Sequence, residues 1–293
     1  MNMIVSLDKP EGITSRQAVD KVKTRLKVKK AGHTGTLDPI ATGLLIVCTG
    51  KSTRLASLFT GLDKTYDIVM KFGQATDTMD RTGTVVQEVE NVSLSENDLQ
   101  EVIKTFTGRI KQTPPMYSAK KVEGKPLYSL ARKGIEIERE AKDITIYQIA
   151  LKDFILPRAS LTVQCSSGTY IRTLCDDIGK ALGCYAHLSE IRRTHIGTFS
   201  VDEAAALDEL SPESTGIVTP DKALSWIPEI TIKPSALRKV KNGNPLRWGD
   251  IAPPIPEIPA NALVKIKTID EKLVAIGSYS EAPPLVVKMK IVF

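Results

Sequence analysis

The order in which helix-like and strand-like patterns follow one another is the feature that most constrains the fold. Apolar residues alternate along 65–73 and form a continuous run at 44–48, and both patterns are typical of strands. Helical spacing occurs at 14–26, 95–107 and 169–182. Because these elements do not repeat as regular strand–helix–strand units, the sequence predicts an α+β fold with a mixed, largely antiparallel sheet flanked by helices.

Polar residues mark where each predicted helix begins. Thr14 and Gln17 have the spacing of a capping box, in which each side chain bonds the other residue's backbone. Ser95 and Asp98 open the second helix in a similar way. Thr169 is predicted to cap the third helix, whose apolar residues would face the core.

Composition narrows the class of protein. Of the 293 residues, 42% are hydrophobic, so the chain can bury a real core. No apolar run reaches the roughly 18 residues that a membrane-spanning helix needs, and the first residues do not have the pattern of a secretory signal. The four cysteines form no CxxC pair, which favours a reducing compartment. We therefore expect a cytoplasmic protein without disulfides or membrane contact.

Basic residues are concentrated in three zones. The formal net charge is only +6, but residues 9–30 hold eight basic and two acidic side chains, residues 109–133 seven and one, and residues 233–293 ten and five. One such zone fits a solvated surface equally well, whereas three together favour a polyanion laid across a broad surface. Aromatic residues make up only 5% of the chain, which favours contact with a folded nucleic acid over stacking along a single strand.

A proline-containing segment predicts a domain boundary. Residues 225–237, SWIPEITIKPSAL, have the composition of a linker, and three short strand-like runs follow them. We therefore expect one domain at 1–232 and a small β-rich domain at 233–293, close to the minimum size for an independent fold.

The segment GHTGTLDPIATGLL, residues 32–45, is the densest unusual motif. Glycines and threonines surround a single carboxylate, Asp38, and Pro39 restricts the backbone of Asp38 to few conformations. A carboxylate presented in this way can act as a nucleophile or a base. It can also simply cap a turn, as aspartate before proline often does.

Two other kinds of site fail on spacing. Residues 49–53, TGKST, end like a phosphate-binding loop, but that motif requires a glycine where this chain has Leu45. The cysteines and histidines between 175 and 195 match no common zinc pattern. We therefore expect packed thiols and no metal site.

Long motifs in a fixed order carry a family resemblance. Residues 32–45 closely resemble the catalytic loop of the bacterial TruB family, the tRNA pseudouridine synthases that act on uridine 55 of the T arm. KPEGITS at 9–15 resembles that family's opening motif, residues 64–83 its second block, and residues 165–199 its third. Residues 112–134 resemble its RNA-gripping insertion, and the tail resembles a shortened PUA domain, an RNA-binding β-barrel module. The resemblance implies the pseudouridine-synthase fold.

The resemblance also implies a reaction. The enzyme would flip uridine 55 out of the T loop, cleave the glycosidic bond, rotate the uracil and rejoin it through carbon. No redox step or external group is needed, so no cofactor is implied. The implied partner is the T arm of tRNA, and we expect a monomer because no long heptad or exposed apolar stripe is present.

Three residues acquire catalytic roles from the resemblance. Asp38 is similar to the essential aspartate of the family, which could attack the sugar, attack the base or remove a sugar proton. Arg172 resembles the arginine that pairs with this aspartate, and an adjacent guanidinium is expected to lower the carboxyl pKa and offset its desolvation. Tyr66 resembles the tyrosine that stacks on the target base, although a tyrosine in a strand more often belongs to the core.

Further residues are implied to bind the substrate. Tyr170 and Ile191 match positions that line the nucleotide pocket, with isoleucine where the family usually has leucine, and His33 matches a histidine that helps to displace the target base. Lys9 is expected to line the RNA cleft. In the insertion, Lys120, with Lys121 and Lys125, is expected to bind phosphates.

One alternative function explains the basic zones equally well. A non-catalytic RNA-folding factor, acting as a chaperone for tRNA, would also need broad positive surfaces. It would leave Asp38, Tyr66 and Arg172 without a shared purpose.

Overall fold

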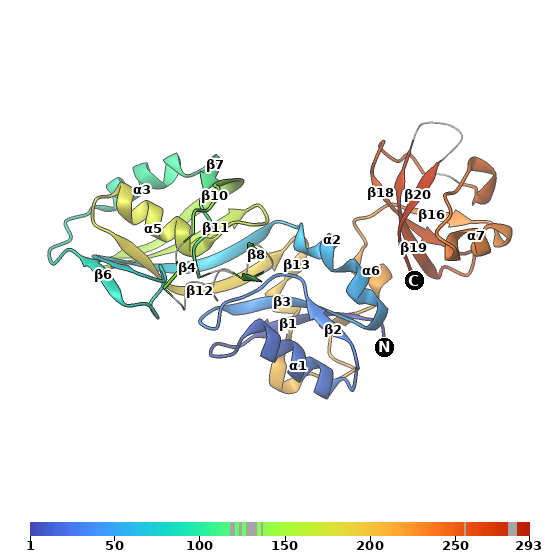
Figure 1. The fold of residues 1–293 in the computed structure, drawn as a ribbon, viewed down its shortest axis with the longest axis horizontal. Helices are drawn as coiled ribbons and strands as arrows, with labels where there is room; N and C mark the ends of the chain where they lie inside the picture. The colour runs from blue at the N-terminus through green and yellow to red at the C-terminus, as the bar shows by residue number, and fades with distance from the viewer. Residues whose placement is uncertain (118–120, 123–124, 127–133, 136, 255, 281–285) are drawn as a thin grey trace.

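The structure is a computed structural model that describes residues 1–117, 121–122, 125–126, 134–135, 137–254, 256–280 and 286–293. A large sheet with helices on both sides makes up most of the chain, and a smaller β-rich part follows it (Figure 1). The predicted α+β class, with a mixed sheet and a β-rich C-terminal part, is confirmed.

The main sheet comprises eleven of the described strands and is largely antiparallel. Its path runs β14-β1-β3-β12-β4-β11-β10-β7, and β2, β13 and β15 pair beside that path. Among the described pairings in this sheet, β1 with β14 and β3 with β12 are parallel. The strand bounds are β1 Ile4–Lys9, β2 Ala31–His33, β3 Thr42–Thr49, β4 Lys64–Phe72, β7 Gly108–Gln112, β10 Lys142–Ile155, β11 Arg158–Cys165, β12 Ala186–Ile196, β13 Phe199–Ser200, β14 Ala205–Ala206 and β15 Ile217–Val218.

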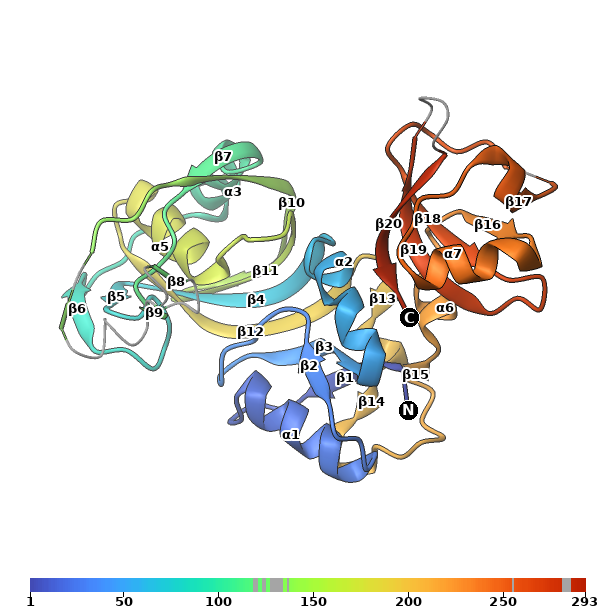
Figure 2. The ribbon, with the colours of Figure 1, turned by 45° about the vertical axis from the view of Figure 1, so that its right-hand side comes forward.

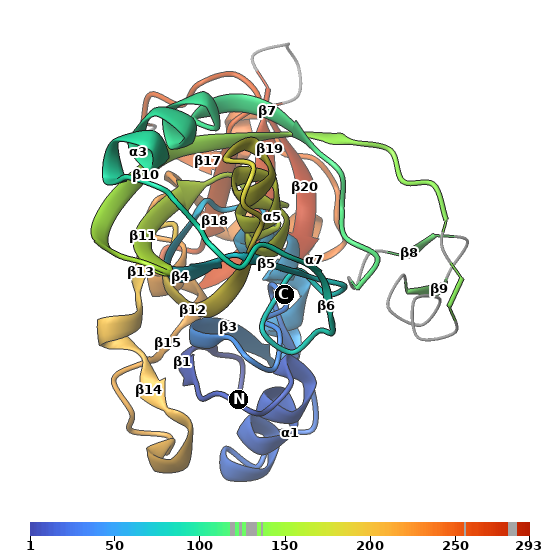
Figure 3. The same ribbon diagram turned by 90° about the vertical axis from the view of Figure 1, so that its left-hand side faces the viewer.

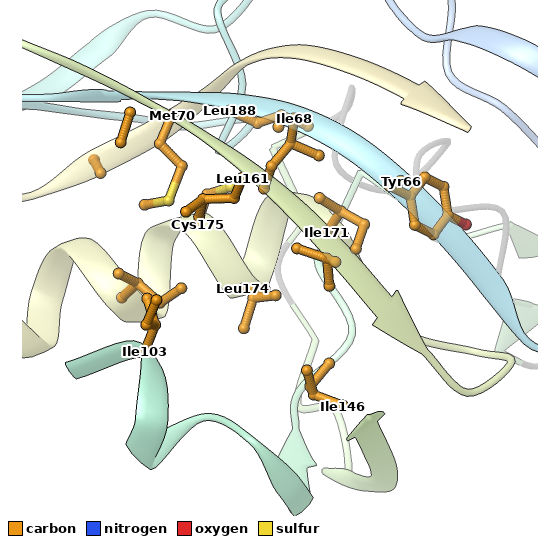
Figure 4. Close-up of a cluster of buried hydrophobic side chains, with 14 of the residues drawn as sticks. Tyr66, Ile68, Met70, Ile103, Ile146, Leu161, Ile171, Leu174, Cys175 and Leu188 are labelled. Carbon is orange, nitrogen blue, oxygen red and sulfur yellow. The ribbon is translucent and has the colours of Figure 1, made fainter. Parts of the chain in front are cut away.

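Helices cover the sheet and enclose separate apolar clusters. Two helices, α3 and α5, pack against β4, β10, β11 and β12 in one cluster, while α1 covers β1 and β3 in another. Figure 4 shows Ile171 and Cys175 of α5 near Ile68 and Leu161 of the sheet, with Tyr66 at one end of the cluster. The helix bounds are α1 Ser15–Arg25, α2 Ala56–Thr60, α3 Glu96–Thr105, α5 Ile171–Ala181, α6 Pro220–Ala223 and α7 Leu237–Lys241.

The predicted starts of the first two helices are confirmed. Thr14 and Gln17 form a capping box at α1, and Ser95 and Asp98 form one at α3. The predicted cap of α5 is wrong, because the N-cap residue is Tyr170 and it makes no side-chain capping bond. The Thr169 hydroxyl instead donates to the carbonyl of Ser166, 3.0 Å away, within the preceding turn.

Two small two-stranded sheets lie outside the main sheet. One joins β5, Gln74–Thr76, to β6, Val85–Glu88. The other joins β8, Lys121–Val122, to β9, Lys125–Pro126, within the segment 112–134. Figure 3 shows β8 and β9 standing away from the main sheet.

The C-terminal sheet has the order β17-β16-β18-β19-β20. Its strands are β16 Glu229–Ile232, β17 Ile251–Ala252, β18 Leu263–Lys267, β19 Leu273–Tyr279 and β20 Val287–Val292. Because β16 pairs with β18, the expected linker contains a strand of this sheet, and we propose that the second domain begins before Glu229 instead of at 233. Its likeness to a PUA domain stays a prediction.

The two parts of the chain are in contact (Figure 2). Ile276 of β19 packs with Phe59 of α2 in one apolar cluster. Two lysines of β18 add charge to the contact: Lys265 and Lys267 each bond both Asp221 and Glu229, at 2.8 to 3.0 Å. Asp221 belongs to α6 and Glu229 to β16, so these pairs fasten the C-terminal sheet to the segment that leads into it.

Candidate active site

The loop between β2 and β3 presents Asp38 at the edge of the main sheet. Ser15, buried at the start of α1, accepts from the amide of Leu37 at 2.8 Å and donates to its carbonyl at 2.9 Å. The amide of Ala41 bonds the carbonyl of Asp38 at 3.0 Å, which closes a turn through Pro39. Leu37 and Ala41 are buried on either side, so the carboxylate between them is held in place.

Arg172 pairs with Asp38 although the two residues are far apart in the chain. Arg172 is the second residue of α5, and its Nε lies 3.0 Å from Oδ2 of Asp38. Its Nη1 donates to the carbonyl of Thr78 at 3.1 Å, and its Nη2 to that of Tyr117 at 2.6 Å. Every nitrogen of the guanidinium therefore has a partner, and its orientation is fixed.

Asp80 is a second carboxylate on the same arginine, and the sequence motifs did not single it out. Its Oδ2 lies 3.4 Å from Nη1 of Arg172, and Asp80 is buried. The hydroxyls of Thr78 and Thr82 donate to Oδ1 of Asp80, at 2.9 and 2.6 Å. These hydrogen bonds hold the Asp80 carboxylate in one orientation toward Arg172.

The pKa of Asp38 corrects one expectation. Burial raises this pKa, and it outweighs the lowering effect of Arg172, while the charge of Asp80 raises it further. The arginine therefore offsets the desolvation of Asp38 only in part. The accessible 43% of the Asp38 side-chain surface faces the cavity that this residue lines.

Asp38 and Arg172 open onto a cavity of about 330 Å³. This volume lies within the range of small-molecule sites, roughly 300–1,000 Å³. The side chains that line it come from five separate parts of the chain, and they include Thr34, Asp38, Lys64, Tyr66, Tyr170, Arg172, Ile191 and Arg193. The predicted residues Asp38, Tyr66, Tyr170, Arg172 and Ile191 thus share one cavity.

Tyr66 lies on β4, across the cavity from the loop. It belongs both to the apolar cluster and to the cavity lining, so the two interpretations of this tyrosine are compatible. Figure 4 shows its hydroxyl pointing away from the labelled apolar side chains. Burial raises the pKa of Tyr66, so the phenol is neutral at physiological pH.

Two further predicted residues differ in how they meet the cavity. Tyr170 precedes Arg172, and its amide and carbonyl both bond the side-chain amide of Gln112, at 2.7 and 3.0 Å. His33 ends β2 and does not line the cavity, but its neighbour Thr34 does. Nδ1 of His33 and the hydroxyl of Thr34 are buried without a described partner.

The expected surface role of Lys9 is not met. Lys9 is 0% exposed, and its ammonium donates to the carbonyls of Pro10 and Ile13, at 2.8 and 2.9 Å. Burial lowers its pKa to about 8. Lys9 therefore holds the turn between β1 and α1 from within instead of lining an RNA cleft. Lys120 lies outside the described residues.

Two buried cations at the cavity were not predicted. Lys64 precedes Tyr66 on β4, and Arg193 lies opposite Tyr66 on β12. The sequence marks neither residue, because a buried lysine or arginine looks the same in a sequence as an exposed one. The one available signal for Lys64 is its place at an inward position of an alternating strand.

Other chemistry finds little support in the described residues. No group of three or more His, Cys, Asp or Glu side chains there is placed to hold a metal ion. The four cysteines are buried and unpaired, which confirms that they are packed thiols. Within the same ranges, no helix is both long and apolar enough to span a bilayer.

The chain matches two family models. Residues 23–171 match the N-terminal domain of the TruB family pseudouridylate synthases, and residues 172–219 match the C-terminal domain of tRNA pseudouridylate synthase B. Among curated relatives, the tRNA pseudouridine synthase B of Bordetella avium is 50% identical over 71% of this chain and 86% of its own length. The corresponding protein of Neisseria meningitidis serogroup A is 39% identical over 96% of this chain and 91% of its own.

Solved structures also resemble the fold. A chain of an H/ACA RNP bound to a substrate RNA containing 2'-deoxyuridine is 27% identical, with a TM-score of 0.75 over 99% of this chain and 84% of its own. A chain of a Cbf5-Nop10-Gar1 complex is 28% identical, with a TM-score of 0.76 over the same shares.

Proposed function

Because this chain belongs to the TruB family of pseudouridylate synthases, we propose that it converts uridine to pseudouridine at position 55 in the T loop of tRNA. The names of its relatives support tRNA as the substrate, and the neighbour bound to a substrate RNA supports RNA binding by this fold. The observation that carries the proposal is the pairing of Asp38 with Arg172 beside Tyr66 in one cavity.

The reaction conserves every atom of the nucleotide. The bond between C1′ of ribose and N1 of uracil breaks, the base rotates, and a bond from C1′ to C5 forms. C5 then loses a proton and N1 gains one, so the net change is an isomerisation that consumes no co-substrate. A site for this reaction needs an ionised group at the sugar and a slot that holds the detached base.

The cavity supplies both requirements. Asp38 is the charged group, and it serves as such whether it bonds to carbon or removes a sugar proton. Arg172 keeps the carboxylate oriented, and Tyr66 offers its ring to the base. Tyr170 and Ile191 also line the slot. We propose that His33, next to the lining residue Thr34, helps to displace the base.

Uridine in a folded loop must be flipped out before it can enter this cavity. Flipping costs a few kcal/mol, and contacts to the RNA backbone have to recover that cost. Exposed basic side chains of α1 and the turn after it, such as Arg16, Lys21, Lys29 and Lys30, are one source of such contacts. The segment 112–134 and the C-terminal sheet are the two others that we propose, and affinity should fall as salt concentration rises.

The test is formation of pseudouridine in a T-arm transcript by the Asp38→Asn variant. We expect the single-turnover rate to fall by at least about 10³-fold, since loss of one member of a catalytic unit removes most of its effect. Affinity for tRNA should stay within about threefold of the parent protein. Asp98→Asn, on the exposed start of α3, is the matched control and should isomerise at the parent rate.

Two results would contradict the proposal. An Asp38→Asn variant that forms pseudouridine at nearly the parent rate would remove Asp38 from the chemistry. A parent protein that binds and refolds tRNA but forms no pseudouridine would favour the RNA-folding factor instead.

A further inference from the structure

The cavity holds positively charged side chains beyond the one that pairs with Asp38 and Asp80. Arg172 faces two carboxylates, Asp38 and Asp80, so its charge is fully compensated. Lys64 and Arg193 line the same cavity, and no described carboxylate forms a salt bridge with either of them. These five groups carry three positive and two negative charges, and the two cations without an ion-pair partner among the described residues are Lys64 and Arg193.

Both cations are deeply buried. Arg193 is 2% exposed and Lys64 is 7% exposed. The Arg193 guanidinium donates to the carbonyls of Leu44, at 2.7 Å, and Gly35, at 3.2 Å. The Lys64 ammonium donates to the carbonyls of Thr60 and Leu62, at 2.6 and 2.5 Å. Carbonyl dipoles solvate these charges but do not neutralise them.

Asp63, next to Lys64 in the sequence, favours the charged ammonium by its own negative charge but forms no salt bridge with it. Asp63 accepts a hydrogen bond from the hydroxyl of Tyr147, 3.1 Å away, at the protein surface. The two cations also act on each other: burial first, and then the charge of Arg193, lowers the pKa of Lys64 to about 8. Lys64 is therefore still charged at neutral pH, at a cost in folding stability.

A buried charge without a counter-ion is costly, and proteins seldom retain one. A pair of them around one cavity is expected where negative charge arrives with the ligand or develops during a reaction. In the proposed reaction that charge has an obvious origin. When the bond between C1′ and N1 breaks, its electron pair leaves with the base and spreads over N1, O2 and O4.

We propose that Lys64 and Arg193 form a binding site for the anionic form of the detached uracil, which holds and stabilises the base while it rotates. This inference rests on the proposed function and adds two catalytic residues to it. The electron pair returns from the base to C1′ when the bond to C5 forms, so the two cations act only on the detached state. They also flank Tyr66, the side chain proposed to contact the base.

A phosphate of the RNA backbone is the other anion that such cations could bind. The burial of both groups argues against it, because a backbone phosphate stays at the mouth of a site from which only the base is inserted. The position of Arg193 on the floor of the loop, bonded to Gly35 and Leu44, supports the base as the anion.

The test measures binding of two uracil-shaped probes to the full chain by calorimetry at pH 7. Barbiturate has the ring of uracil but is an anion at this pH, whereas uracil is neutral. We expect the parent protein to bind barbiturate at least about tenfold more tightly than uracil. The preference should fall toward parity in Lys64→Gln and in Arg193→Gln, and it should persist in Arg193→Lys.

The matched control is Lys71→Gln, on the same strand β4 but outside the cavity, which should keep the full preference. If Arg193→Gln does not fold, Lys64→Gln carries the test alone. Equal affinity of the parent for both probes, or an unchanged preference in the charge-neutralised variants, would overturn the inference. Inorganic phosphate that displaces barbiturate at comparable concentration would overturn it too, by identifying a backbone site.

Turnover separates this inference from the function on which it rests. We expect Lys64→Gln to lower the single-turnover rate by about 10²-fold, as removal of one preorganised charge does, with little change in affinity for tRNA. A parent protein that forms no pseudouridine defeats the proposed function. A parent that forms it while lacking any preference for barbiturate defeats only the anion site.

Discussion

Two clusters of charge in this molecule are built in opposite ways. At the cavity, Arg172 is buried, two carboxylates share it, and its remaining nitrogens are taken by backbone carbonyls. In the C-terminal sheet and the helix α6 before it, Lys265 and Lys267 are buried, but Asp221 and Glu229 lie partly in solvent. The first cluster fixes one arginine in one orientation, and the second offers four interchangeable pairings between two lysines and two acids.

The difference teaches what each cluster can do. Each nitrogen of the Arg172 guanidinium has a partner, so Arg172 holds Asp38 in one position. It does so although burial disfavours the charged form of Asp38. Exchangeable pairs at a half-exposed contact tolerate small movements of the C-terminal sheet against α6 and are screened by salt. We therefore expect changes in the first cluster to alter chemistry and changes in the second to alter only the docking of the C-terminal sheet.

The largest expected loss of stability comes from a substitution at Gly43, where β3 passes close to the backbone of β12. Gly43 has φ +98°, and a Cβ there would come within 2.3 Å of the carbonyl oxygen of Arg193 on β12. Gly43→Ala should therefore separate β3 from β12 and lower the free energy of unfolding by more than about 3 kcal/mol, measured by urea denaturation. Gly108→Ala is the control, with φ +100° but nothing within 4 Å, and should cost only backbone strain of about 1–2 kcal/mol. Equal losses for both variants would refute the steric argument.

Asp80→Asn tests whether the negative charge of Asp80, and not only its shape, is needed to hold Arg172. The amide keeps the shape of the side chain and its bonds to Thr78 and Thr82, but Arg172 loses one of its two counter-charges. We expect the single-turnover rate of pseudouridine formation to fall by about 10²-fold with tRNA affinity unchanged. A rate near that of the parent would show that Asp38 alone is enough to hold the arginine.

The raised pKa of Asp38 leads to a prediction about stability. Its pKa is higher in the folded than in the unfolded chain, so the folded state binds the proton more tightly, and stability is lost as pH rises through the folded pKa. Asp38→Asn should therefore unfold at a higher temperature than the parent at pH 7, and this advantage should vanish in acid, where Asp38 is protonated.

Asp98→Asn should change the stability at pH 7 in the opposite direction. Its bonds to Ser95 lower the pKa of Asp98, so its charge stabilises the folded state at neutral pH and that stability is lost in acid. This variant should be less stable than the parent at pH 7. An Asp38→Asn variant that also loses stability at pH 7 would show that the pair with Arg172 outweighs desolvation.

The smallest effect belongs to the second cluster. Lys267→Met removes two partly screened ion pairs, and we expect a loss of about 1 kcal/mol or less that shrinks as salt is added. The rate of isomerisation on bound RNA should not change. Lys272→Met is the control, since its exposed pair with Asp270 should contribute nothing measurable. A slowed chemical step in Lys267→Met would break the proposed division between the two clusters.

Helix starts and single strands can be predicted from the sequence where the pattern that marks them spans only a few neighbouring residues. The capping boxes at Thr14 and Ser95 and the alternation along β4 each depend on residues a few positions apart. The strand β12 does not show such a pattern. Charged and polar residues interrupt its apolar ones, and two register shifts against β4 break the alternation of inward and outward side chains. The strand β16 is hidden in the same way, since prolines flank four residues that read as a linker.

The site could be predicted only where a motif or a family likeness pointed to it. Asp38 stands out within its loop, and the likeness adds Arg172 and Tyr66. Arg193 carries no sequence signal and Lys64 only its inward position in the alternating strand β4, because burial of a charged side chain is a property of the folded chain. For the same reason the sequence leads to the expectation that Lys9 lines an RNA cleft. In the structure its ammonium is buried and donates to the carbonyls of Pro10 and Ile13.

The hydrogen bond from Arg172 to the carbonyl of Tyr117 links the cavity to another part of the chain. Tyr117 belongs to the basic segment 112–134, so one guanidinium contacts both Asp38 and the segment that we propose to bind RNA. Any displacement of that segment at Tyr117 would break a hydrogen bond of the residue that orients Asp38. If segment 112–134 binds RNA as we propose, its position and the orientation of Asp38 would depend on the same guanidinium.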